Sequence, residues 1–155
     1  MKLVLQEFLT LDGVSQGPGS PDEDRRDGFA LGGWFVPFLD DAFLQLVQAW
    51  TLEADAFLFG RRTYQAFAQA WPQMDDPADV VARSLNGLPK YVASRTLTPA
   101  DATWGPVTVL GEDLPAQVAA LKAQPGREVQ IHGSATLGQS LLDAGLIDAL
   151  RLVIA

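Results

Sequence analysis

The chain has 155 residues, of which 48% are apolar and 19% are charged, as expected for one ordinary globular domain. It has no cysteine and one histidine, His132, which excludes disulfides, a thiolate nucleophile and a metal site built from cysteines or clustered histidines. The net charge of -8 opposes binding to nucleic acid or to an anionic membrane surface. Without a membrane span or a signal peptide in the sequence, we expect a soluble cytoplasmic protein.

The first sixty residues predict a strand, a long loop, a helix and a second strand. Residues 3–11 are strand-like and end at a turn signal, Asp12-Gly13. Residues 14–33 hold five glycines and two prolines, which favours either a functional lid or a disordered segment. Apolar residues at helical spacing follow Pro37 and predict a helix, and the apolar run 56–59 predicts a buried strand.

Helices and strands alternate in the rest of the chain. Helices are predicted from Gly60 to Trp71-Pro72, at 114–123 with Asp113 as N-cap, and from Gly133-Ser134 to Gly145. Strands are predicted at 90–94, 107–110, 128–132 and 149–154. Because parallel neighbours need crossover connections, this order indicates an α/β sandwich with a mostly parallel sheet.

Three of the predicted strands end in small, hydroxyl or arginine residues: Gly60-Arg61-Arg62-Thr63, Ser94-Arg95-Thr96 and Gly133-Ser134-Ala135-Thr136. Ligands of open α/β sheets bind at the carboxyl ends of the strands, where helix N-termini and arginines attract phosphate. The three segments together indicate a ligand with several phosphates, although the chain has neither G-x-G-x-x-G nor a P-loop. Taken singly, Thr63 and Ser134 are equally explained as N-caps.

Three further residues have both a chemical and a structural interpretation. Asp12 is the best-placed carboxylate for proton transfer near a pocket at the sheet end, or it belongs only to the turn. Trp34 follows Gly32-Gly33 and either lines a pocket for a flat ring or packs in the core. His132 lies within a strand, which favours a hydrogen-bonded structural role.

These segments together resemble the dihydrofolate reductase-like superfamily, and more narrowly the C-terminal domain of the bacterial bifunctional deaminase-reductase of riboflavin synthesis, in a stand-alone form. The resemblance covers the whole chain. It rests on Leu11-Asp12-Gly13 with Gly17-Pro18-Gly19, Phe59 to Tyr64 with Trp71-Pro72, Leu88 to Thr96, and His132 to Leu137.

The resemblance implies a three-layer sandwich with a mostly parallel mixed sheet and helices on both faces, and it implies NADPH as cofactor. The cofactor phosphates would lie at Gly60, Arg61, Arg62 and Thr63 and at Gly133, Ser134, Ala135 and Thr136. Ser94, Arg95 and Thr96 would approach the adenosine 2′-phosphate. Asp12 inherits a substrate or proton role. The family's deaminase domain is absent from the chain, and the acidic segment 14–33 differs from the riboflavin enzymes.

The resemblance also bears on the end of the chain and on its partners. The resemblance implies that relatives continue past the strand at 149–154, so we expect residues 1–155 to be one domain that lacks the last strand or strands of the family. We therefore expect a homodimer that pairs through the Leu150 to Ile154 strand. The expected function is NADPH-dependent hydride transfer to a C=N or C=O group of a small pterin- or pyrimidine-like molecule. The alternative is an inactive nucleotide-binding or sensor protein of the same fold.

Overall fold

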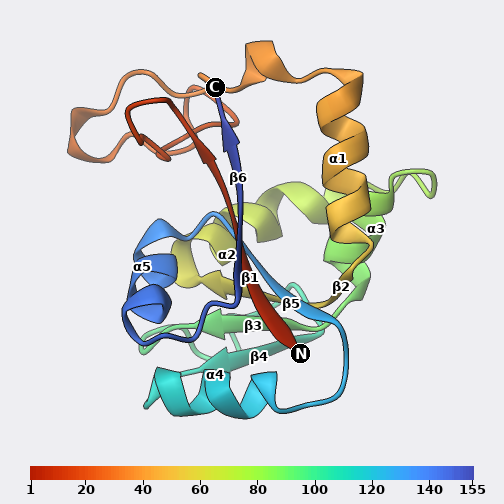
Figure 1. The fold of residues 1–155 in the computed structure, drawn as a ribbon, viewed down its shortest axis with the longest axis vertical. Coiled ribbons are helices and arrows are strands. Elements are labelled where there is room, and N and C mark those ends of the chain that lie inside the picture. The colour runs from red at the N-terminus through yellow and green to blue at the C-terminus, as the bar shows by residue number, and fades with distance from the viewer.

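Six strands form one sheet in the order β4-β3-β2-β5-β1-β6, in a computed structural model that describes residues 1–155 (Figure 1). The strands are β1 (Lys2–Leu9), β2 (Ala54–Gly60), β3 (Lys90–Ala93), β4 (Val107–Leu110), β5 (Glu128–His132) and β6 (Ala149–Ile154). The α/β prediction is confirmed. All five pairings are parallel, so the sheet lacks the antiparallel component of the mixed sheet that the resemblance implies.

The protein has five α-helices, and none of them is long and apolar enough to cross a lipid bilayer. They are α1 (Asp41–Thr51), α2 (Arg61–Ala70), α3 (Val80–Gly87), α4 (Leu114–Lys122) and α5 (Ala135–Asp143). Helices α2 to α5 cover the two faces of the sheet, while α1 packs beside α3. One core cluster joins the sheet to α4 and α5 and includes Leu58 and Leu141. The other joins it to α2 and α3 and includes Phe57 and Tyr64. Two clusters on opposite faces make a three-layer sandwich.

Two helices differ from the sequence prediction. α1 begins at Asp41 instead of directly after Pro37, because the Asp40 side chain accepts a 2.8 Å hydrogen bond from the Phe43 amide and caps the helix. Pro37 belongs to a short 3-10 turn, Val36–Phe38. α3 was not predicted from the sequence, although Asp79 caps it by accepting from the Ala82 amide at 2.9 Å.

The segment between β1 and α1 forms the red-to-orange upper part of Figure 1 and contains no strand or α-helix. It folds back on itself. The Gly33 amide donates to the Gly17 carbonyl at 2.8 Å, and the Trp34 indole Nε1 donates to the Gln16 carbonyl at 2.8 Å. Gly32 lies so close to the other arm that an added Cβ would come within 2.6 Å of the Ser20 carbonyl oxygen. Only glycine fits there.

Candidate functional site

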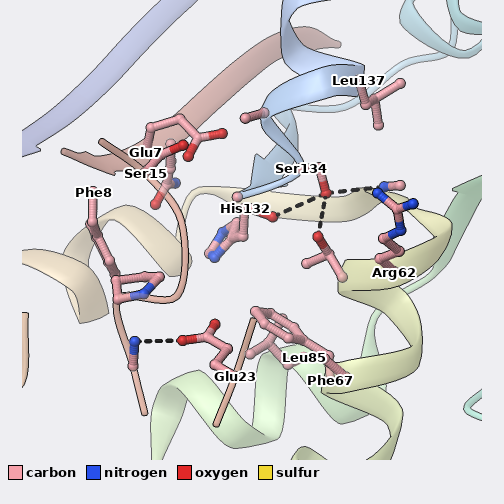
Figure 2. Close-up of a pocket in the computed structure, with 18 of the residues that line it drawn as sticks. Glu7, Phe8, Ser15, Glu23, Arg62, Phe67, Leu85, His132, Ser134 and Leu137 are labelled. Carbon is pink, nitrogen blue, oxygen red and sulfur yellow. Dashed lines mark hydrogen bonds between the residues drawn. The ribbon is translucent and has the colours of Figure 1, made fainter. Parts of the chain in front are cut away.

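A cavity of about 1800 Å³ opens at the carboxyl ends of the strands. Glu7 and Phe8 of β1, Gly60 of β2 and His132 of β5 line it, as do residues that follow β3 (Figure 2). Pockets for single drug-sized ligands span about 300 to 1,000 Å³. This cavity therefore has room for a ligand as large as a dinucleotide together with a second small molecule.

The cavity brings together ten of the eleven residues that the sequence analysis assigns to a cofactor. These are Gly60, Arg61, Arg62, Thr63, Ser94, Arg95, Gly133, Ser134, Ala135 and Thr136. Thr96 does not line the cavity, but its Oγ1 accepts a 2.6 Å hydrogen bond from the Arg61 guanidinium. The three strand ends, distant in sequence, therefore belong to one site.

A hydroxyl group joins the N-termini of α2 and α5. The Gly60 amide donates to Ser134 Oγ at 3.0 Å, and Ser134 Oγ donates to Thr63 Oγ1 at 2.9 Å (Figure 2). Neither helix has a side-chain cap, so Ser134 and Thr63 bind each other instead of acting as N-caps. The uncapped N-terminal amides leave two positive helix ends at the cavity, an arrangement that suits an anion with more than one phosphate.

Three arginines at this end of the cavity have no acidic partner. Arg61, Arg62 and Arg95 line the cavity. The six ion pairs of the protein use other cations, namely Arg25, Arg26, Lys122, Arg127 and Arg151. In a chain of net charge -8, three unpaired guanidinium groups around one cavity form a local anion-binding region.

An aromatic wall lines another part of the cavity. Phe8 and Phe35 stack with ring centroids 4.7 Å apart, and Phe43 of α1 meets Phe35 edge-on at 5.0 Å. Trp34 is not part of the lining, contrary to one of its two interpretations. It packs edge-on against Phe35 at 5.7 Å and supports the wall from behind. The sequence analysis missed Phe35, although this residue directly follows Trp34.

The model of the RibD C-terminal domain family matches residues 1–155. The chain belongs to this family. The family is the reductase domain of riboflavin biosynthesis, which agrees with the resemblance found in the sequence.

Two individual proteins are similar to this RibD C-terminal domain over nearly its whole length. One is "Uncharacterized protein YyaP" of Bacillus subtilis strain 168, which is 24% identical over 155 residues, covering 99% of this chain and 73% of that protein. The other is a crystal structure from Shewanella sp. PV-4, titled a "putative riboflavin biosynthesis protein". It superposes with a TM-score of 0.59 at 22% identity, covering 99% of this chain and 75% of that one, and supports the fold.

In this RibD C-terminal domain, Asp12 lies on an exposed turn after β1 and is not among the residues that line the cavity. Its Oδ1 accepts a 2.5 Å hydrogen bond from Thr10 Oγ1. Of the two interpretations of Asp12, this position favours the turn over proton transfer.

Two titratable groups of the cavity lie deep in the sheet. Burial, and then the positive charge of Arg151, lower the pKa of His132 to about 4, so its ring is neutral at pH 7. The His132 Nε2 hydrogen-bonds Gln130 Oε1 at 3.1 Å, as expected for a structural histidine. Burial raises the pKa of Glu7 to about 7. The sequence analysis missed Glu7, although two adjacent polar residues in an apolar strand, Gln6-Glu7, mark the position.

No three side chains of His, Cys, Asp or Glu are arranged to hold a metal ion.

Proposed function

We propose that this protein is an NADPH-dependent reductase that transfers a hydride to a C=N or C=O group of a small pterin- or pyrimidine-like molecule. The observation that carries this proposal is the meeting of three strand ends, each with an arginine or a glycine, with an aromatic wall in one cavity. The strand ends suit a phosphorylated dinucleotide. The aromatic wall suits the flat ring of a substrate.

The donor set fits NADPH in its chemistry. Gly60, Arg62, Gly133 and Ser134 would hold the diphosphate, where two uncapped helix N-termini and a guanidinium offer donors. Gly133 has a φ of 56°, a conformation that favours glycine, and it has no side chain to block a close approach of phosphate.

The adenosine 2′-phosphate would lie at the end of β3. Arg95 and Ser94 line the cavity there, and the Arg61 to Thr96 hydrogen bond brings a second guanidinium to the same segment. A phosphate calls for arginine at this point, whereas NAD enzymes place a carboxylate there. When bound, the cofactor supplies the hydride, and the protein supplies binding, orientation and charge.

A second candidate function is nucleotide binding without catalysis. It is favoured by the small number of cavity groups that titrate near neutral pH, since His132 is neutral and most cavity carboxylates are already hydrogen-bonded within the protein.

One experiment separates these functions. Tryptophan fluorescence would follow titration with NADPH and NADH, and nicotinamide absorbance would then follow NADPH oxidation with a panel of pterins, flavin precursors and quinones. Turnover with any member supports the reductase. Tight NADPH binding with no turnover across the panel favours the sensor, and failure of NADPH to bind contradicts the cofactor assignment.

A further inference from the structure

Glu7 is a buried carboxyl group with an unused oxygen at the cavity. It lies near the carboxyl end of β1, and its side chain lines the cavity although the residue is only 8% exposed. Its Oε1 is buried and has no hydrogen-bond partner. In Figure 2 the carboxyl group of Glu7 lies across the cavity from Arg62. A buried polar atom without a partner is rare in proteins and calls for an explanation, such as a catalytic role or a bound water or ion.

The other carboxyl groups of the cavity are occupied or exposed. Glu23 accepts from the Gly19 and Ser20 amides at 2.5 and 3.3 Å, and the Arg26 guanidinium holds the pKa of Asp24 at about 2. The remaining acids accept from backbone amides or lie exposed: Asp76, Asp79, Asp113 and Glu112. Glu7 is therefore the cavity acid that is both buried and free to bind a ligand.

The pleat of the sheet isolates Glu7 from positive charge. The neighbouring Gln6 is in register with His132 of β5 and Arg151 of β6, so these two basic side chains project to the same face as Gln6. Glu7 projects to the opposite face, toward α5. There it is in register with Leu152, and β5 continues into Gly133, which has no side chain.

The loop after β1 and helix α5 bring no unpaired cation to Glu7. The loop carries Arg25 and Arg26, but Arg25 pairs with Asp22 and Arg26 pairs with Asp24. Helix α5 carries a single charged residue, Asp143, at its far end. With no opposite charge on its face, Glu7 has a raised pKa because of burial alone.

We propose that Glu7 is the catalytic acid of this cavity and donates its carboxyl proton to a nitrogen of the substrate. This inference rests on the proposed reductase function. As the carbon of a C=N group accepts the hydride with its electron pair, the Glu7 O–H bond breaks, an N–H bond forms, and Glu7 becomes a carboxylate that water reprotonates.

This assignment narrows the substrate class. Proton transfer is most efficient when the acid and the receiving atom have similar pKa values near the working pH. A ring nitrogen of an imine or dihydro-heterocycle is far more basic than a carbonyl oxygen, so a buried carboxyl group protonates the nitrogen more readily. We therefore expect a substrate with a C=N bond.

The first test observes Glu7 directly and needs no substrate. The chain has five glutamates, Glu7, Glu23, Glu53, Glu112 and Glu128. In protein labelled with ¹³C at glutamate Cδ, the Glu7→Gln variant identifies the Glu7 signal. We expect this signal to titrate with a midpoint near 7, well above the ordinary value of about 4.3. A midpoint near the ordinary value would overturn the proposal.

The second test uses the same variant with a matched control. Glu53→Gln makes the same chemical change at a surface residue whose carboxylate lies 3.9 Å from Arg127, outside the cavity lining. We expect Glu7→Gln to bind NADPH within twofold of the unsubstituted protein and to reduce a C=N substrate at least about 100-fold more slowly. Glu53→Gln should match the unsubstituted protein in both measurements.

The pH profile separates a proton donor from a packing residue. In the unsubstituted protein, kcat/KM should fall as pH rises through about 7, because Glu7 loses its proton, and this limb should be missing in Glu7→Gln and shifted in Glu7→Asp. A Glu7→Gln variant with the full rate and the same limb would overturn the proposal. If NADPH fails to bind the unsubstituted protein, the proposed function itself fails. NADPH binding together with an ordinary Glu7 titration overturns the proton-donor role alone.

Discussion

Ser134 Oγ lies 2.9 Å from Thr63 Oγ1 and ties the start of α5 to the start of α2. The same oxygen accepts from the Gly60 amide at 3.0 Å, so one hydroxyl holds both helix N-termini of the cavity in place. Ser134 also has a φ of 64°, in the left-handed region that costs a residue with a Cβ about 1 to 2 kcal/mol.

We predict that Ser134→Ala and Ser134→Gly differ from each other in stability but bind NADPH equally weakly. Both variants lose the hydroxyl bridge, which should weaken NADPH binding about tenfold, equivalent to about 1.4 kcal/mol. Ser134→Ala should lower the free energy of unfolding by about 1 to 3 kcal/mol, whereas glycine should recover about 1 kcal/mol by relieving the backbone. Denaturant unfolding and fluorescence titration measure the two effects. Equal stability of the two variants would contradict the role of the backbone conformation.

Arg95 should set the choice of cofactor. Charge-assisted hydrogen bonds contribute about 1.5 to 3 kcal/mol each, so NADPH should bind at least about tenfold more tightly than NADH. Arg95→Glu should erase or reverse this preference and leave NADH affinity nearly unchanged. Arg83→Glu, the same charge change at a residue outside the cavity lining, serves as control in the fluorescence titration. Equal affinities in the unsubstituted protein would contradict the 2′-phosphate assignment.

The Asp12→Asn variant tests whether Asp12 only stabilises the turn after β1 or also transfers a proton. With Asp12 exposed and its Oδ1 bound by Thr10 Oγ1, we expect kcat within about twofold of the unsubstituted protein and a slightly lower melting temperature. A fall in kcat of about 100-fold with unchanged NADPH affinity would instead assign proton delivery to Asp12 and away from Glu7. Steady-state kinetics and thermal unfolding give the two readouts.

Lys90 is a buried cation that satisfies the end of α3. It is 1% exposed, and its Nζ donates to the carbonyls of Leu85, Leu88 and Asn86 at 2.7, 2.9 and 3.2 Å. Lys90→Met would leave these carbonyls without their donor. We predict a loss of about 1 to 3 kcal/mol in the free energy of unfolding at pH 7, measured with denaturant. An equally stable variant would show that water replaces the ammonium group.

The same residue predicts a pH dependence of stability. Burial lowers the pKa of Lys90 to about 8, below its ordinary value in the unfolded chain. The unfolded chain therefore binds more protons between pH 8 and about 10, and the contribution of Lys90 to stability must rise with pH over that window. Subtracting the profile of Lys90→Met from that of the unsubstituted protein isolates this contribution. A difference that falls with pH would contradict the lowered pKa.

We propose that β6 is the contact between two copies of this chain. It is an edge strand of the sheet, and Leu150, Leu152 and Ile154 on one of its faces are 49%, 45% and 59% exposed. Bare apolar edges pair with other chains. Sedimentation or light scattering should report a dimer that Leu152→Lys converts to monomer. A monomer at all concentrations of the unsubstituted protein would contradict this pairing.

The sequence predicted most of the fold because its strands are marked clearly. β4, β5 and β6 have the predicted bounds, since each is a short segment with apolar residues at alternating or consecutive positions, between turn or helix signals. α3 was missed because it is only eight residues long and contains Ser84, Asn86 and Gly87, which are weak helix formers, so that only Asp79 signalled its start. The start of α1 was misplaced because a proline and an aspartate N-cap are both valid start signals, and here the aspartate caps the helix.

The part of the candidate site that is built from strand ends could be predicted from the sequence. The part that depends on which side chains share one face of the sheet could not. Arg62, Arg95 and Ser134 follow strands, and parallel strands end at one edge, so their meeting follows from topology. The isolation of Glu7 depends instead on which neighbours in register share its face, and a single strand sequence does not contain that information.

The place of β5 in the sheet has a consequence for how the chain is made. β1 and β2 do not pair with each other, because β5 lies between them and pairs with both. During synthesis, the first two strands must wait until residues 128–132 leave the ribosome before the centre of the sheet can close. Contacts between such distant segments form slowly, and the waiting strands expose apolar edges. The nascent chain is therefore most aggregation-prone just before residues 128–132 emerge, when β1 and β2 still lack the strand that joins them.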